Sequence, residues 1–302
     1  MVELSIVVVT YKTKELVINF LTSVERELEA SGLAAKIIVV DNASQDGTVE
    51  SVRDKFPEAI VIANNENSGP AKAFNLGIKE GIDSKYVLVS NSDIQVLPGT
   101  IKVMYEYLEA NSDVMGVSGP LLNEDGTLQQ TRTQIMGFKS PKWDQPFQVE
   151  FVGTTFALIR REAYLQLGGY DENYYFYNED LDWAERAKRQ GLRFMALPEA
   201  KVIHFLSKGM VQNRSRIMRE LYWSNIYYFK KFYPKISWLV YRILSLEIHF
   251  NIAKLKKQLR KLEVNHQQDL EQQMQDLVVA KNRMKKHYTN SLEPKIPFWG
   301  QM

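Results

Sequence analysis

The feature that most constrains the fold is a regular alternation of apolar, strand-like runs with helical patterns in the N-terminal part of the chain. Strands that are apolar along their whole length and alternate with helices are typical of a parallel sheet covered by helices on both faces. We therefore expect an α/β fold with a mostly parallel central sheet. The strand-like runs are LSIVVVT, KIIVVD, AIVIAN and KYVLVS, at residues 4–10, 36–41, 59–64 and 85–90.

Polar side chains follow each of these runs. In a parallel α/β sheet, ligands bind beyond the carboxyl ends of the strands, so these residues share one rim. Any single end is also explained as an ordinary turn, because Asn, Asp, Ser and Gly are common turn formers. The four ends together favour a site for a polar ligand. They are Thr10-Tyr11-Lys12, Asp41-Asn42-Ala43-Ser44, residues 64–69 (NNENSG) and Asn91-Ser92-Asp93.

The turn after the first run, TYKTKE, contains no glycine. A glycine-rich dinucleotide loop is therefore missing there, and the chain has no Walker loop ending in Gly-Lys-Ser/Thr. A nucleotide at this rim needs another group to neutralise its phosphates, and a divalent cation on Asp93 would do so. Mn²⁺ and Mg²⁺ prefer oxygen ligands and often bridge substrate phosphates, so we expect one of them as the cofactor.

A second acidic cluster begins the predicted helix EDLDWAERAKRQG, which follows the aromatic stretch NYYFYN. Its first turn carries Glu179, Asp180 and Asp182. Acidic residues in a first helical turn are often only caps and dipole partners, and that reading stands for Glu179 and Asp182. Taken together, three carboxylates next to an aromatic stretch are typical of the residues that line a ligand-binding cleft.

Composition and charge exclude some kinds of site and indicate the cellular compartment that we expect. The chain has no cysteine, which excludes disulfides, thiolate zinc sites and a cysteine nucleophile, and which fits a reducing compartment. Its start predicts a strand and not a signal peptide, and no apolar run reaches the length of a spanning helix. Residues 205–263 hold thirteen Lys/Arg against three Asp/Glu, although the whole chain has a net charge of only +2. We expect a cytoplasmic protein peripherally associated with the inner face of the cell membrane.

The basic, aromatic segment 213–241 has two readings. Its composition suits amphipathic helices on an anionic membrane surface. Alternatively, it is a helix packed on the catalytic domain through its aromatic side chains. We expect three parts in the chain, namely residues 1–210, 211–245 and 246–302.

The last part carries a narrow apolar seam with coiled-coil spacing and one four-residue stutter, with His266 in its gap. A seam this narrow is unstable alone, so we expect a homo-oligomer, most simply a dimer, or antiparallel pairing with another helix. The seam consists of Ile248, Ile252, Leu255, Leu259, Leu262, Leu270, Met274, Leu277 and Met284.

In their order and spacing, six segments of the chain resemble the inverting family-two glycosyltransferases with the GT-A fold. The likeness is particularly close to the rhamnosyltransferase-like branch that acts on bacterial surface polysaccharides. It runs from about residue 3 to about residue 235, and its strength lies in the ordered series. The segments are SIVVVTYK, IIVVDNASQDGT, NNENSGPAKAFNLGI, VLVSNSDI, FVGTTFALIRREAYLQLGGYDENYYFYNEDLDWAERAKRQG and VIH.

The resemblance implies a site for a nucleotide-sugar donor. Thr10 and Tyr11 would line the base and ribose, and Asp41 would accept a hydrogen bond from the pyrimidine N–H. Lys72 would reach a phosphate, although a solvated helix lysine is an equal reading. The other implied donor-binding residues are Asn42, Asn65, Gly69, Asn91 and Ser92.

The resemblance also implies the metal ligands. Asn91-Ser92-Asp93 stands where the family has D-x-D, with asparagine in place of the first carboxylate. Asp93 would then be the principal ligand. His204 would complete the metal or phosphate contacts, and because a lone histidine after a strand is usually structural, its role rests on the resemblance.

Inverting transfer is one in-line displacement that needs help for the departing diphosphate and a base on the opposite side of the sugar. We expect Asp180 to be the base, with Glu179 as the second choice that orients the acceptor or the loop. Gly153 and Thr154 are expected to border the acceptor pocket. Asp182, Trp183 and Arg186 are expected to be acceptor contacts or support, with core packing as another reading of Trp183.

The favoured function is transfer of rhamnose from dTDP-rhamnose to a lipid-linked or polysaccharide acceptor. A UDP-hexose is the competing donor. A non-catalytic glycan-assembly scaffold, recruiting partners through its coiled coil, is the second class, and it would hydrolyse no donor. A nucleic-acid binder is the third class, but the chain has no recognisable reading motif for it.

Overall fold

The computed structural model describes residues 3–130, 142–206, 214–259, 267–290 and 293–297 of the 302-residue chain. Contacts divide the chain into two units, each of which is described by itself. The first unit comprises Met1–Glu172, Glu179–Ser207 and Ile296–Met302, and the second comprises Asn173–Asn178 and Lys208–Lys295. This grouping differs from the three expected parts, because the helices after residue 213 belong to one unit.

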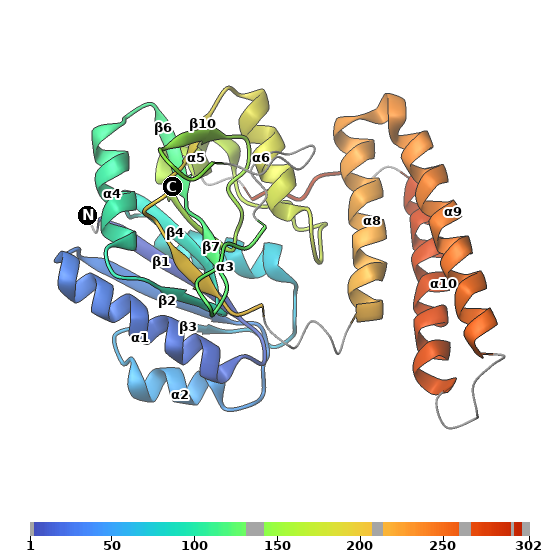
Figure 1. The fold of residues 1–302 in the computed structure, drawn as a ribbon, viewed down its shortest axis with the longest axis horizontal. Coiled ribbons are helices and arrows are strands. Elements are labelled where there is room, and N and C mark those ends of the chain that lie inside the picture. The colour runs from blue at the N-terminus through green and yellow to red at the C-terminus, as the bar shows by residue number, and fades with distance from the viewer. Residues whose placement is uncertain (1–2, 131–141, 207–213, 260–266, 291–292, 298–302) are drawn as a thin grey trace. The chain divides into compact units, whose positions relative to one another are not determined.

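The central sheet of the first unit has eight strands in the order β3-β2-β1-β4-β9-β6-β10-β8. Its first four strands are parallel and include all four predicted runs, whereas β9 runs antiparallel to both β4 and β6. The predicted α/β fold with a mostly parallel sheet is therefore confirmed (Figure 1). The strands are β1 (Leu4–Thr10), β2 (Ala35–Asp41), β3 (Ile60–Ala63), β4 (Tyr86–Asn91), β6 (Val114–Ser118), β8 (Phe147–Val149), β9 (Phe156–Arg160) and β10 (Arg193–Ala196).

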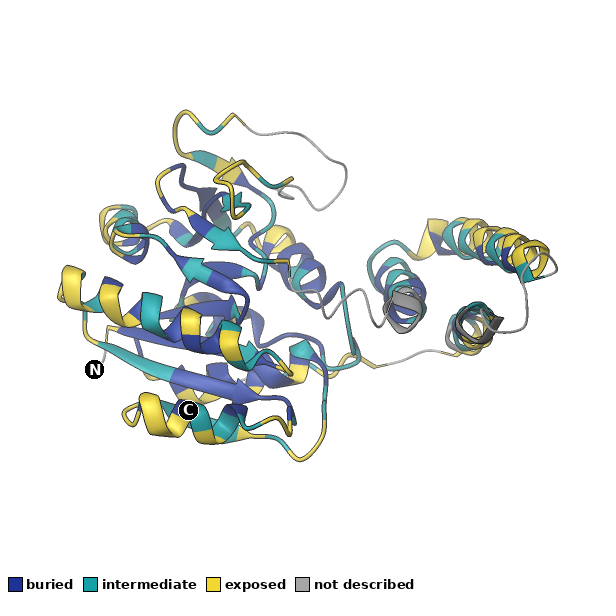
Figure 2. Cartoon of the chain, turned by 60° about the horizontal axis from the view of Figure 1, so that its bottom comes forward, coloured by how far each residue is buried: buried dark blue, intermediate teal, exposed yellow. Residues whose placement is uncertain are grey.

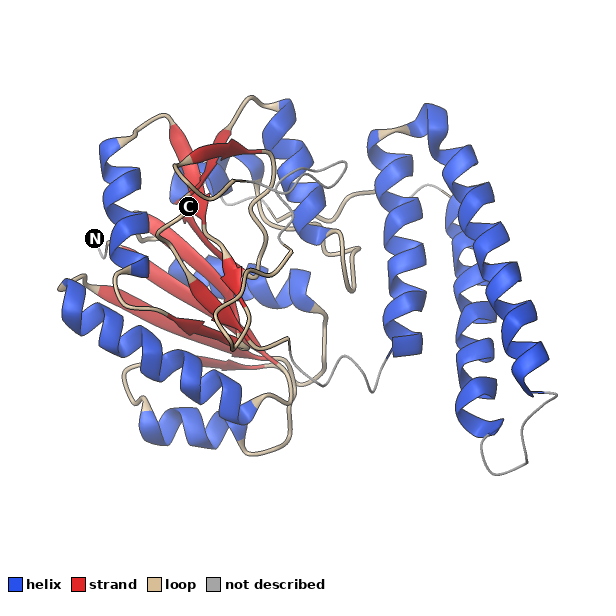
Figure 3. Cartoon of the chain, in the orientation of Figure 1, coloured by secondary structure: helices blue, strands red, loops and turns tan. Residues whose placement is uncertain are grey.

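Helices cover both faces of this sheet, as Figure 3 shows. Successive residues of a strand point to opposite faces, and β1 follows this rule. Ile6 and Val8 pack with residues of α1 (Lys14–Ser31), α2 (Thr48–Lys55) and α4 (Thr100–Ala110). Val7 packs with residues of α3 (Pro70–Gly81), α5 (Arg161–Leu167) and α6 (Glu179–Arg189). The inner strands β1, β4 and β9 are almost entirely buried, and the outer sides of the helices are exposed (Figure 2).

The close approach of α3 to β1 depends on a glycine. A Cβ atom added to Gly77 would lie only 2.3 Å from Cγ1 of Val7. Any other residue there would push α3 away from the sheet. The loop before α3 is thereby held near the carboxyl ends of the strands.

A small second sheet has the order β5-β11-β7, formed by Ile94–Val96, Val202–His204 and Leu121–Leu122. β11 runs antiparallel to β5, with His204 opposite Ile94. This register brings His204 beside Asp93, which immediately precedes β5.

The second unit contains α8 (Arg214–Phe232), α9 (Pro234–Leu259) and α10 (Gln267–Thr289), and consecutive helices run antiparallel (Figure 1). Its core contains Tyr222 and Ile226 of α8, Ile248 of α9, and Ala280 and Met284 of α10. Within the described residues, no helix is long and apolar enough to span a membrane.

The predicted seam lies partly inside this unit. Ile248 and Met284 are in its core, and Ile252 and Leu277 pack against that core. The structure thus shows the antiparallel pairing within one chain, while the homo-oligomer stays a prediction. Leu262 and His266 lie outside the described residues.

Candidate active site

The ends of β1 and β2 lie side by side, with Thr10 opposite Asp41 in the sheet register. The buried Asp41 carboxylate accepts hydrogen bonds from the backbone N–H of Ser44, at 3.0 Å, and from the Ser44 hydroxyl. Ser44 Oγ also accepts a 2.8 Å hydrogen bond from the backbone N–H of Lys12, a residue with a positive φ of 54°. These hydrogen bonds hold both strand ends in a defined geometry. Asp41, the expected pyrimidine-binding carboxylate, is the last residue of β2.

Asn42 organises the loop between β3 and α3. Its Oδ1 accepts hydrogen bonds from Asn64 Nδ2 at 3.1 Å, from the Ser68 backbone N–H at 3.1 Å and from the Ser68 hydroxyl at 3.2 Å. Its Nδ2 donates to Asn67 Oδ1 at 3.0 Å and to the Gly69 carbonyl at 3.3 Å. An asparagine amide has two donors and one carbonyl oxygen, so this side chain is fully used. We therefore replace its expected contact with the nucleotide by a structural role.

A chain of hydroxyl groups joins the ends of β1 and β4. Thr10 Oγ1 lies 2.9 Å from Thr13 Oγ1, which lies 2.7 Å from Ser92 Oγ. Thr13 carries no motif of its own and was missed in the sequence. The side chains of Tyr11, Asn65 and Lys72 are exposed near these strand ends, where a ligand can reach them.

Asp93 and His204 form the candidate metal pair. Asp93 Oδ1 lies 3.5 Å from His204 Nε2. Gln129, which carries no motif that would select it from the sequence, donates from Nε2 to the His204 carbonyl at 2.7 Å, and its Oε1 lies 2.9 Å from His204 Nδ1. We assign the ring hydrogen to Nδ1, because Gln129 Oε1 can only accept. Nε2 faces the Asp93 carboxylate.

This arrangement fits a divalent cation. A metal-bound histidine usually donates its other ring N–H to an oxygen, as His204 does here to Gln129. Two ligand atoms 3.5 Å apart can both reach one ion at bond lengths of about 2.1 Å. In the described part of the chain no group of three or more His, Asp or Glu residues converges on one point. Mg²⁺ and Mn²⁺ commonly complete such a site with phosphate oxygens and water.

An open hollow of about 330 Å³ borders His204. Its other lining residues are Asn123, Glu124, Asp125, Phe205 and Leu206. The side chains of His204 and Asp93 are themselves only 13% and 12% exposed.

Glu179 and Asp180 begin α6 and form the candidate acid–base pair. Only 5% of the Glu179 surface is exposed, and its Oε2 has no hydrogen-bond partner among the described residues. Burial, together with the neighbouring Asp180 charge, raises the pKa of Glu179 to about 8. Glu179 is therefore mostly protonated at neutral pH, which removes the repulsion between two adjacent carboxylates.

A short segment connects this acidic pair with the metal motif. A Cβ atom added to Gly153 would lie 3.5 Å from Asp180 Oδ2, so the backbone passes close to that carboxylate. Two residues later, the Thr155 carbonyl accepts a 3.1 Å hydrogen bond from the Asn91 backbone N–H. Residues 153–155 thus run from the Asp180 carboxylate to the residue that begins Asn91-Ser92-Asp93. Thr154, expected in the acceptor pocket, is buried in this segment.

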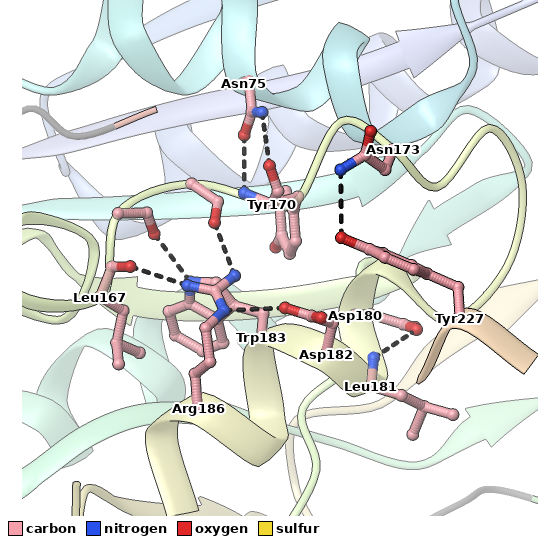
Figure 4. Close-up of polar contacts among 12 residues, drawn as sticks. Asn75, Leu167, Tyr170, Asn173, Asp180, Leu181, Asp182, Trp183, Arg186 and Tyr227 are labelled. Atoms are coloured by element: carbon pink, nitrogen blue, oxygen red, sulfur yellow. Dashed lines mark hydrogen bonds and ion pairs between the residues drawn. The ribbon is translucent and has the colours of Figure 1, made fainter. Parts of the chain in front are cut away.

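Three residues expected to contact the acceptor are instead part of the interior. Arg186 Nε donates to Asp182 Oδ1 at 2.8 Å, and its two terminal nitrogens donate to the carbonyls of Leu167 and Gly169, both at 2.7 Å (Figure 4). Trp183 is buried and donates from Nε1 to the Gly168 carbonyl at 3.1 Å. These contacts fix the turn between α5 and α6, so we do not assign Asp182, Trp183 and Arg186 to the acceptor site.

Asn75 is another residue that the sequence did not single out. Its Oδ1 accepts from the Tyr170 backbone N–H at 2.8 Å, and its Nδ2 donates to the Tyr170 carbonyl at 2.9 Å (Figure 4). Nδ2 also donates to Glu172 Oε1 at 3.0 Å. The only signal was a polar residue on the apolar side of a helix. Its role is to hold the chain before the aromatic loop.

The aromatic loop, residues 173–178, is bound by α8 within the second unit. Ser224 Oγ donates to the Phe176 carbonyl at 2.8 Å, and Asn178 Nδ2 donates to Asn225 Oδ1 at 3.0 Å. Asn173 Nδ2 donates to the Tyr227 hydroxyl at 3.1 Å. The last two loop residues have positive φ angles of 66° and 68°, a conformation that non-glycine residues adopt only when their surroundings enforce it.

Comparisons with known proteins point to one kind of chemistry. A family model described as glycosyl transferase family 2 matches residues 5–168. An N-acetylglucosaminyl-diphospho-decaprenol L-rhamnosyltransferase from Mycobacterium tuberculosis is 28% identical over 238 residues, which cover 67% of this chain and 75% of that protein.

Two solved structures resemble the fold. A mannosyltransferase from Pyrobaculum calidifontis, in complex with GDP-Man and Mn²⁺, has a TM-score of 0.56 and 16% identity, covering 96% of this chain and 76% of that one. GalNAc-T7 with UDP, GalNAc and Mn²⁺ has a TM-score of 0.56 and 14% identity, covering 78% of this chain and 52% of that one. The architecture is a GT-A-like α/β fold with C-terminal helices.

Proposed function

The chain belongs to glycosyl transferase family 2, and from this premise we propose that it transfers rhamnose from dTDP-rhamnose, with inversion, to a hydroxyl of a lipid-linked or polysaccharide acceptor. The 28% identity with an L-rhamnosyltransferase supports this choice of sugar. The single observation that carries a catalytic role is the Asp93–His204 pair, with its imidazole oriented by Gln129.

Binding of the donor follows from the strand ends. Asp41 accepts a hydrogen bond from the pyrimidine N–H, and Tyr11 and Thr10 line the base and ribose. Asp93 and His204 would hold a divalent cation, preferably Mn²⁺, which would supply positive charge for the departing diphosphate. Exposed Lys72 adds a second positive charge for the phosphates.

The chemical step needs a base near the acceptor hydroxyl. Asp180 takes the hydroxyl proton as the acceptor oxygen bonds to the anomeric carbon and the bond from that carbon to the diphosphate oxygen breaks. Gly153 leaves space beside the Asp180 carboxylate, since it has no side chain there. Protonated Glu179 donates a hydrogen bond that orients the acceptor and does not compete for the proton.

A panel of donors tests this proposal. The protein is heated with dTDP-rhamnose, UDP-glucose, UDP-galactose or GDP-mannose, each with and without Mn²⁺, because a ligand stabilises in proportion to ln(1 + [L]/Kd). We expect the largest rise in Tm with dTDP-rhamnose and Mn²⁺, together with slow Mn²⁺-dependent hydrolysis of that donor. A larger rise with a UDP-hexose would replace the sugar but keep the reaction.

The non-catalytic scaffold gives a different result. It shows no hydrolysis of any donor and no transfer, whichever nucleotide sugar stabilises it. The buried, protonated Glu179 beside Asp180 favours catalysis over the scaffold, because an unpartnered buried carboxyl group costs stability that a scaffold gains nothing from. A homo-oligomer and a position at the inner face of the cell membrane complete the proposal.

A further inference from the structure

Helix α9 exposes a continuous apolar stripe on the side opposite its core contacts. Its residues recur at alternating spacings of three and four, so they line one side of the helix along about 21 Å. Their exposed fractions range from 45% to 71%. We define the α9 stripe as Ile236, Leu239, Ile243, Leu246 and Phe250.

The opposite side of α9 is already used. Ile248 is in the core of the helical unit, and Val240, Leu244 and Ile252 pack against that core. A helix that packs on one side normally carries polar residues on the other. The α9 stripe departs from this pattern, and a contiguous exposed apolar surface usually marks an interaction site.

The charges on α9 indicate the kind of partner. The helix contains five basic residues and one acidic residue. Lys235 and Arg242 are exposed beside the stripe, and Lys254, Lys256 and Lys257 are exposed near the helix end. The one acidic residue, Glu247, accepts a 2.9 Å hydrogen bond from the Tyr222 hydroxyl.

We propose that the α9 stripe docks on an anionic lipid bilayer, with its apolar side chains at the acyl boundary and its basic residues among the headgroups. Trp238, which is half exposed beside the stripe, suits the boundary between water and lipid. A second copy of this chain is the less favoured partner of the α9 stripe, because pairing two α9 helices would bring two basic surfaces together. This position keeps only the α9 part of the expected segment 213–241, since the α8 aromatics Tyr222, Trp223, Tyr227 and Tyr228 are buried.

Vesicle binding by the full chain tests the proposal. The protein is sedimented with vesicles of phosphatidylcholine and phosphatidylglycerol, and separately with phosphatidylcholine alone. We expect binding to the anionic vesicles that weakens with salt, and little to the neutral ones. The double variant Ile243→Ser/Leu246→Ser should bind at least about tenfold more weakly. Arg242→Glu should bind more weakly without any loss of apolar surface on the stripe.

The matched control is Val278→Ser/Val279→Ser on α10, whose side chains are 43% and 46% exposed. It should bind as the unmodified protein does, and all variants should keep its Tm. Absence of binding to anionic vesicles, or an equal loss in the control, overturns the proposal. A second outcome also overturns it. If the protein does not bind vesicles and sedimentation velocity shows a dimer that Ile243→Ser/Leu246→Ser dissociates, the α9 stripe binds a second copy of this chain.

Discussion

Asp93 Oδ1 and His204 Nε2 lie 3.5 Å apart, although the two residues come from distant parts of the sequence. The antiparallel pairing of β5 with β11 causes this proximity. Gln129 orients the imidazole of His204 and so completes this candidate ion site.

Removing the side chain of either Asp93 or His204 should weaken metal binding. We expect Asp93→Ala and His204→Ala each to reduce Mn²⁺ affinity at least about tenfold, and donor affinity in the presence of Mn²⁺ to fall with it. Calorimetric titration with Mn²⁺ and then with the donor measures both. His249→Ala, at an exposed position of α9, is the matched control and should leave both affinities unchanged.

Asp180→Asn should separate binding from chemistry. The amide cannot take the proton of the acceptor hydroxyl, so we expect transfer to slow by about 10²- to 10⁴-fold while the donor Kd stays the same. Initial rates and a donor titration on the same sample measure the two effects. Transfer at the normal rate would mean that another group is the base.

Glu179 should make the stability of the protein depend on pH. Its pKa is raised from 4.5 to about 8 on folding, so the folded state binds more protons between these values. The free energy of unfolding should therefore decrease as pH rises from about 4.5 to about 8. The variant Glu179→Gln has no titrating group at this position, so its free energy of unfolding should lack this dependence on pH. Urea unfolding at several pH values measures the difference, and parallel curves for the two proteins would contradict the raised pKa.

Asn42→Ala should destabilise the protein by about 2 kcal/mol or more, because it leaves the part-buried polar groups of Asn64, Asn67 and Ser68 and the buried Gly69 carbonyl without this partner. Asn65→Ala is the matched control in the same loop, where the side chain is exposed, and should change stability by less than about 0.5 kcal/mol. Urea midpoints measure both. Equal midpoints for the two variants would show that Asn42 does not organise the loop.

The four N-terminal strands and their parallel arrangement could be predicted, because each run is apolar along its length and alternates with a helical pattern. Family resemblance supplied the pairing of Asp93 with His204. The roles of Asn42, Asn75 and Gln129 could not be predicted, since each depends on partners that only the folded chain brings near. Trp183 and Arg186 were assigned to the acceptor because aromatic and basic residues near carboxylates suit a sugar, whereas burial assigns them to the interior.

The last consequence concerns the aromatic loop 173–178, whose hydrogen-bond partners lie on α8. A chain shortened at residue 207 would keep the loop but lose those partners, and the residue after the loop is Glu179. Near the other end of the chain, the Pro297 carbonyl accepts a 2.9 Å hydrogen bond from the Gly169 backbone N–H. Truncation of the C-terminal helices would therefore remove contacts that hold this loop. Assays of catalysis should use the full chain.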